Sequence, residues 1–127
     1  MKNLPFLFIF LASLFALGGM ALGIYMGMSE NHSGELVDAH AHNNLLGWVT
    51  MALFGLYYKA VPAAAVTRLA MIHFWVALVG AATFGIGVYL TASGITWIIQ
   101  ISSLLVIASM AIFAWTIWSN RGGLNAG

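Results

Sequence analysis

The sequence has no cysteine, and it is poor in charged residues. The absence of cysteine excludes disulfide bonds, thiolate metal sites, iron–sulfur clusters and covalent c-type haem attachment. Any metal would therefore be held by histidine, methionine or oxygen ligands. Only 6% of the residues are charged, against about a quarter in an average soluble domain. The net charge of +1 gives no basis for binding nucleic acid.

Long apolar runs take the place of a polar surface, and 62% of the residues are hydrophobic. A transmembrane helix needs about 20 mostly apolar residues. The runs are continuous and not alternating, which indicates helices and not barrel strands. We therefore predict an all-α integral membrane protein, built as one four-helix domain over residues 1–127. The predicted spans are residues 5–28, 39–60, 67–91 and 95–118.

Two further observations concern the first span and the orientation. The first run is longer than the roughly 7 to 15 residues of a signal-peptide core, so we expect a retained helix. With four spans, all basic residues fall on one side of the membrane and all acidic residues on the other. Positive charge marks the cytoplasmic side, which predicts that both termini are cytoplasmic. The basic residues are Lys2, Lys59, Arg68 and Arg121, and the acidic residues are Glu30, Glu35 and Asp38.

Two histidines near the start of the second span are the candidate functional residues. His40 and His42 follow Asp38, which we expect to cap the helix, and the positive end of the helix dipole favours neutral, metal-binding imidazoles. Residues two apart on a helix are separated by roughly 200°, so the two rings point to nearly opposite faces. They serve two different sites, one on each flank, or at most one is a ligand. Anchoring of the helix at the interface is the alternative without a ligand.

The surroundings of this pair and the other two histidines add to the pattern. Gly47 and Gly55 on the same span let a flat macrocycle or another helix approach the backbone closely. His73 lies near the cytoplasmic end of the third span, roughly 20 Å in depth from His42 at 1.5 Å per residue. We expect it to be neutral and bonded to a neighbouring helix. His32 is expected to be a solvated loop residue.

Several motifs resemble one membrane protein family. The second span carries Ala39-His40-Ala41-His42, Leu46-Gly47-Trp48 and Phe54-Gly55-Leu56-Tyr57-Tyr58, with Pro62 closing the turn. These residues resemble the tenth helix of haem–copper oxidase subunit I, closest to the cbb3-type oxidase and nitric oxide reductase branch. Ile72-His73-Phe74-Trp75 and the glycines after it resemble the eleventh helix. By position, the whole chain resembles helices nine to twelve of that subunit.

The resemblance implies a haem site but no copper centre. In the family, the first histidine of the pair binds the high-spin haem and the second binds the low-spin haem. The copper ligands lie on helices that have no counterpart in this chain. The family's twelve helices form three similar four-helix arcs, so a four-helix chain is able to rebuild the ring as a homotrimer. We expect His40 of one protomer and His42 of the next to bind one b-type haem. A homodimer with the haem between paired His42 residues is the simpler alternative.

A haem iron held by two histidines has no open position, which favours electron transfer over oxygen binding. The predicted function is therefore electron transport, with unidentified donor and acceptor, in the inner (plasma) membrane of a bacterium or archaeon. The site formed by His40 and His42 is expected near the outer face. One alternative is a haem-dependent reductase of oxygen or nitric oxide, with a single histidine ligand. Another is a cofactor-free accessory or assembly protein of a respiratory complex. The sequence assigns no catalytic residue.

Overall fold

The computed structural model describes residues 3–30 and 32–125, and this part of the chain contains helices and turns but no β-strand. Lys2, one of the four basic residues, lies outside the described residues. The elements are α1 (Leu4–Ser29), α2 (Gly34–His42), the π-helix η1 (Asn43–Thr50), α3 (Met51–Ala60), α4 (Pro62–Ala65), α5 (Arg68–Leu90), the 3-10 helix η2 (Thr91–Ser93), α6 (Trp97–Ser119) and the 3-10 helix η3 (Arg121–Asn125).

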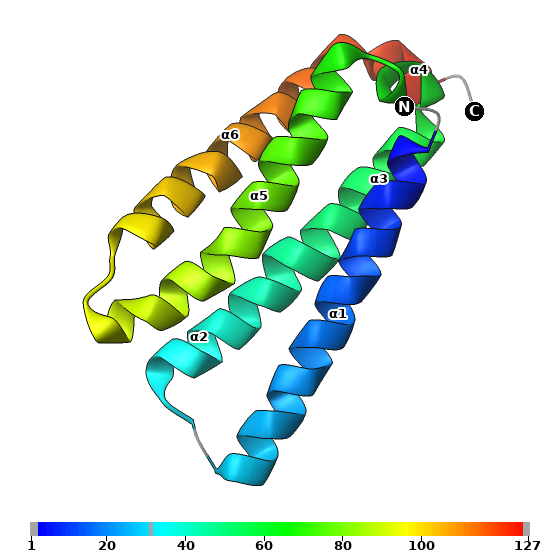
Figure 1. Ribbon diagram of the computed structural model, residues 1–127. Coiled ribbons are helices and arrows are strands. Elements are labelled where there is room, and N and C mark those ends of the chain that lie inside the picture. The colour runs from blue at the N-terminus through cyan, green and yellow to red at the C-terminus, as the bar shows by residue number, and fades with distance from the viewer. Residues whose placement is uncertain (1–2, 31, 126–127) are drawn as a thin grey trace.

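Four long helical rods follow one another in space as they do along the chain (Figure 1). The consecutive elements α2, η1 and α3 form one continuous rod. It packs against α1 on one side and α5 on the other, and α5 packs against α6. Short connections make each rod antiparallel to the next. The described ends of the chain and α4 therefore lie at one end of the bundle, and the α1–α2 connection lies at the other (Figure 1).

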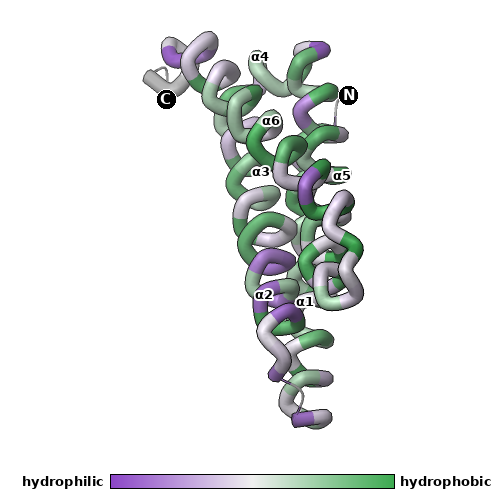
Figure 2. The backbone as a smooth tube through the Cα atoms, turned by 90° about the vertical axis from the view of Figure 1, so that its left-hand side faces the viewer, coloured by the Kyte–Doolittle hydropathy of each residue, from purple (hydrophilic) through white to green (hydrophobic). Residues whose placement is uncertain are grey.

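Within the described residues, three helical segments are long and apolar enough to cross a membrane: Leu4–Ser29, Arg68–Ser93 and Trp97–Ser119. Large apolar side chains cover the outside of the bundle. Leu17, Leu104 and Trp115, for example, are 62%, 68% and 62% exposed. Such outward apolar side chains suit a lipid environment. Figure 2 shows hydrophobic residues along the length of the helices, with a hydrophilic stretch in and just after α2. The prediction of an all-α membrane protein is confirmed at this level.

The tightest packing lies in the half of the bundle that holds the termini. Phe8 of α1 is fully buried, and its ring centroid lies 5.0 Å from that of Phe74 in α5 and 5.6 Å from that of Tyr58 in α3. Aromatic pairs at such distances stabilise by about 0.5–1.5 kcal/mol beyond their buried area. At the opposite end the helices diverge, which leaves a pocket between α1, α2 and α5.

The second rod begins earlier than expected, and the predicted N-cap is wrong. Ser33, and not Asp38, caps the helix, and the backbone N–H groups of Leu36 and Val37 each donate to the Ser33 carbonyl oxygen at 3.1 Å. Burial of the Leu36 side chain favours this additional helical turn. His40 and His42 consequently lie beyond the first turn, where the helix dipole acts only weakly.

A π-helix follows His42 directly and was not predicted. Thr50 Oγ1 donates to the carbonyl oxygen of Leu45, five residues earlier, at 2.8 Å. Asn43 Nδ2 donates to the carbonyl oxygen of Phe15 in α1 at 3.0 Å, which ties this segment to the neighbouring helix. Such wide turns are rare, and they are frequent at functional sites.

Candidate functional site

His42 is held in one orientation and one tautomer. Its Nδ1 lies 2.7 Å from the carbonyl oxygen of Asp38, one turn earlier. A carbonyl oxygen only accepts hydrogen bonds, so Nδ1 carries the proton and Nε2 of the neutral ring has a lone pair. The ring stacks on Phe84 of α5, with centroids 4.9 Å apart and planes inclined by 30°. A metal-binding histidine has the same arrangement, in which the second nitrogen donates to an oxygen.

His40 is packed differently, against α1. A Cβ at Gly23 would lie 3.2 Å from Cε1 of His40, which is tighter than an ordinary van der Waals contact, so the ring packs closely on this glycine. Asn44 Nδ2 donates to the His40 carbonyl oxygen at 3.0 Å and lies 3.3 Å from its Nε2. The Nδ1 atom is buried and has no hydrogen-bond partner in the described residues. A buried polar atom without a partner costs about 1–3 kcal/mol, which marks this ring as incompletely satisfied.

The two imidazoles therefore face different neighbouring helices, as their spacing predicts. His40 lies against α1 at Gly23, and His42 lies against α5 at Phe84. The structure does not bring them together, and the described residues contain no group of three or more histidine or acidic side chains suited to a metal ion. Each ring is half-buried. Within one chain, each histidine can contribute one ligand to a site on its own flank.

The glycines of the second rod serve helix packing in this chain. A Cβ at Gly47 would collide with the ring of Phe15, and a Cβ at Gly55 would lie 2.6 Å from Cγ1 of Ile9 and 3.1 Å from the Pro5 carbonyl oxygen. These contacts all come from α1. Of the two sequence interpretations, close approach of another helix therefore describes Gly47 and Gly55, because α1 already covers them.

The remaining histidines lie away from this pair. His73 is fully buried, and its Nδ1 lies 2.9 Å from Oη of Tyr58 in α3, which confirms the expected bond to a neighbouring helix. Its ring stacks on Phe113 of α6, and its Nε2 is buried with no partner in the described residues. His32 is an exposed loop residue. Both therefore have structural or solvated roles.

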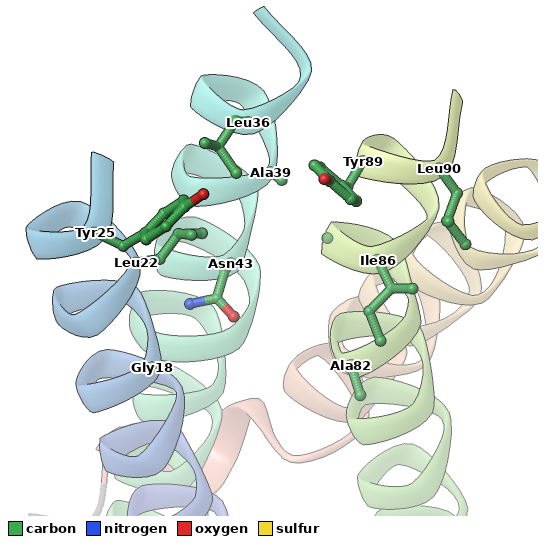
Figure 3. A pocket seen from close by; sticks show the side chains of 11 residues that line it. Gly18, Leu22, Tyr25, Leu36, Ala39, Asn43, Ala82, Ile86, Tyr89 and Leu90 are labelled. Atoms are coloured by element: carbon green, nitrogen blue, oxygen red, sulfur yellow. The ribbon is translucent and has the colours of Figure 1, made fainter. Parts of the chain in front are cut away.

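A pocket of about 490 Å³ lies beside the histidine pair and was missed by sequence reasoning. Figure 3 shows Tyr25 and Leu22 on the α1 wall, Tyr89 and Ile86 on the α5 wall, and Asn43 between them. Neither His40 nor His42 lines it. No single motif signals such a pocket, because three helices distant in sequence contribute to it.

No family model, curated protein or solved structure matches this chain. The resemblance to haem–copper oxidase subunit I thus stays a prediction from residues 38–90. What the structure adds is a test of fit for the implied haem. His42 fits as an axial ligand, since its tautomer is fixed and Nε2 has no partner among the described residues. His40 offers a buried Nδ1 with no hydrogen-bond partner in the described residues, but its ring packs against Gly23 of α1.

Proposed function

We propose that this protein binds a b-type haem through His40 and His42 and transfers electrons within the membrane. The tautomer of His42 is the observation that carries the proposal. Because Nδ1 donates to the Asp38 carbonyl oxygen at 2.7 Å, Nε2 is available to iron at no cost in lost hydrogen bonds. Iron with two histidine ligands exchanges one electron and has no open position for oxygen.

The two ligands come from neighbouring protomers of a homo-oligomer, preferably a trimer. The rings leave opposite faces of one helix, His40 toward α1 and His42 toward α5 of the same chain, so a single chain does not bring both to one iron. Cyclic head-to-tail contacts bring such unlike surfaces together. The trimer binds one haem at each interface, or one per protomer. In a dimer with paired His42 residues, the ratio is one haem per two protomers.

The chain crosses the bilayer four times, with both termini in the cytoplasm. The continuity of the rod from Gly34 to Ala60, which three elements compose, supports its role as the fourth span. Lys59, Arg68 and Arg121 belong to the end that holds α4 and the described termini. The acidic loop and the histidine pair lie at the opposite end. This asymmetry of charge supports a site near the outer face of a bacterial or archaeal plasma membrane.

Visible spectroscopy of the detergent-purified protein tests the proposal. The oxidised and dithionite-reduced spectra are recorded with and without carbon monoxide, together with the haem-to-protein ratio. We expect sharp reduced bands that carbon monoxide leaves unchanged, because both axial positions are filled. A protein that stays colourless after haem is added contradicts the proposal. That result would favour the accessory or assembly role, which purification of the native complex then tests by its partner subunits.

A second candidate function is reduction of oxygen or nitric oxide at a haem with one histidine ligand. The observation that favours it is the different surroundings of the two imidazole rings. His42 has a free Nε2, whereas His40 contacts α1 and Asn44. Iron bound by His42 alone keeps an open coordination position. A shift of the reduced bands on adding carbon monoxide selects this function, and loss of haem in His40→Ala argues against it.

A further inference from the structure

We propose that the pocket between α1, α2 and α5 binds a neutral amphiphile with a hydroxylated six-membered ring, of the quinol class, from the membrane. This inference does not depend on haem binding. It rests on the size, the polar groups and the charge of the pocket, and on its place at the end of the bundle that holds the acidic loop.

The pocket has the size and composition of a small-molecule site. Its volume of about 490 Å³ lies within the range of about 300–1,000 Å³ for ligand pockets. Apolar side chains such as Leu22 and Ile86 form most of the walls, and Tyr25 and Tyr89 face each other from α1 and α5 (Figure 3). Two aromatic walls suit a flat ring, because aromatic groups pack well on each other's faces.

Asn43 supplies a directed hydrogen-bond acceptor. Its Nδ2 donates to the Phe15 carbonyl oxygen at 3.0 Å, which fixes the amide. The nitrogen therefore points toward α1 and the oxygen toward the α5 side of the pocket (Figure 3). The amide oxygen accepts but does not donate. A ring hydroxyl that donates a hydrogen bond is complementary to it, whereas a ring carbonyl is not.

The charge of this end of the bundle selects against anionic lipid headgroups. None of the described residues that line the pocket is charged. The nearest charged side chains along the chain are Glu35 and Asp38 of α2, which are acidic, and Lys59, Arg68 and Arg121 belong to the opposite end. A phosphate group would therefore be desolvated without a cation to pair with it. A neutral ring with hydroxyl groups meets no such penalty.

Two glycines of α1 provide a matched pair of variants. A Cβ at Gly18, which lines the pocket, has no other atom within 4 Å, so Gly18→Leu projects a side chain into the pocket without a backbone clash. A Cβ at Gly27 is equally free, but Gly27 does not line the pocket. Both substitutions favour the helix by removing glycine. Gly27→Leu therefore controls for hydrophobicity and folding.

The experiment is calorimetric titration of the detergent-purified full chain with decylubiquinol, and separately with decylubiquinone. We expect saturable binding of the quinol that Gly18→Leu weakens at least tenfold and Gly27→Leu leaves unchanged. The quinone, which lacks the hydroxyl donors, should bind about twofold to tenfold more weakly than the quinol. The titration measures quinol binding, and it is possible with protein that contains haem or lacks it. Absence of quinol binding therefore leaves the haem proposal unaffected.

Two results would overturn the inference. Identical titrations for the wild type and both variants would mean that the quinol only partitions into the micelle. Retention of one phospholipid by the wild type but not by Gly18→Leu, without quinol binding, would make the pocket a phospholipid site.

Discussion

The Nδ1 atom of His42 lies 2.7 Å from the carbonyl oxygen of Asp38, so the backbone of its own helix sets the tautomer of this imidazole. His40, two residues earlier, has no equivalent bond, and its Nδ1 is buried without a partner in the described residues. The two rings therefore differ in their surroundings, because the His40 ring packs against Gly23 and its Nε2 lies 3.3 Å from Asn44 Nδ2.

The proposed topology is testable because the chain contains no cysteine. We expect His32→Cys, in the exposed loop at the acidic end, to react with a membrane-impermeant maleimide on intact cells. Gly122→Cys, which is exposed near the described C-terminal end, should react only after the membrane is permeabilised. Labelling of both positions, or of Gly122→Cys alone, on intact cells would rule out four spans with cytoplasmic termini.

The buried pair Tyr58 and His73 should contribute to stability. Tyr58→Phe removes the hydroxyl that lies 2.9 Å from His73 Nδ1 and leaves that nitrogen unpaired in an aromatic environment. We expect a loss of about 1–3 kcal/mol in the free energy of unfolding. Tyr57→Phe is the control, because the Tyr57 hydroxyl makes only a 3.4 Å contact with the Thr116 carbonyl oxygen. Equal denaturation midpoints in detergent for the two variants would refute the assignment.

Close contact between α5 and α6 depends on Gly87. A Cβ at this position would lie 2.8 Å from the backbone nitrogen and 2.9 Å from Cα of Ile99. Backbone atoms cannot turn aside as a side chain can, so Gly87→Ala should destabilise the protein by about 1–3 kcal/mol. Gly27→Ala faces open space and should gain up to about 1 kcal/mol from helix propensity. Thermal unfolding of both variants measures the difference, and a Gly87→Ala protein as stable as the wild type would contradict the predicted clash.

Two buried serines of α6 should differ in their response to alanine. Ser102 Oγ lies 2.7 Å from Thr83 Oγ1 of α5, whereas Ser109 Oγ is buried with no partner in the described residues. Ser102→Ala is expected to cost about 0.6 kcal/mol and at most about 1.7 kcal/mol, the mean and the maximum found for hydrogen bonds between membrane helices. Ser109→Ala should be neutral or stabilising, because it removes an unsatisfied hydroxyl. The opposite order of unfolding midpoints would disprove the assignment of partners.

Hydropathy alone located the helices, since α1, α5 and α6 end within a few residues of the predicted boundaries. It did not locate Ser33 as the cap of the second rod, because the burial of Leu36 that extends the helix is a tertiary effect. The π-helix was missed for a related reason. The bond from Asn43 to the Phe15 carbonyl oxygen links residues 28 apart, which no local periodicity records.

For the site, the angle of roughly 200° between residues two apart on a helix predicted that His40 and His42 point to opposite faces. The contacts of these rings with Gly23 and Phe84 agree with that prediction. The partners of Gly47 were not predictable, since a glycine in a sequence does not state whether a helix or a macrocycle covers it. The pocket was equally hidden, because Tyr25 and Tyr89 meet across it only after the rods have packed.

Reduced-minus-oxidised visible spectra of the wild type, His42→Ala, His40→Ala and His32→Ala, purified side by side with their haem content, test the central claim most directly. Haem ligation by both histidines predicts sharp reduced bands in the wild type and in the loop variant His32→Ala, and none in His42→Ala or His40→Ala. Haem retained in His40→Ala alone would rule out the trimer, and the response to carbon monoxide would then distinguish a dimer with paired His42 residues from iron bound by a single His42. A full spectrum in His42→Ala would contradict the account.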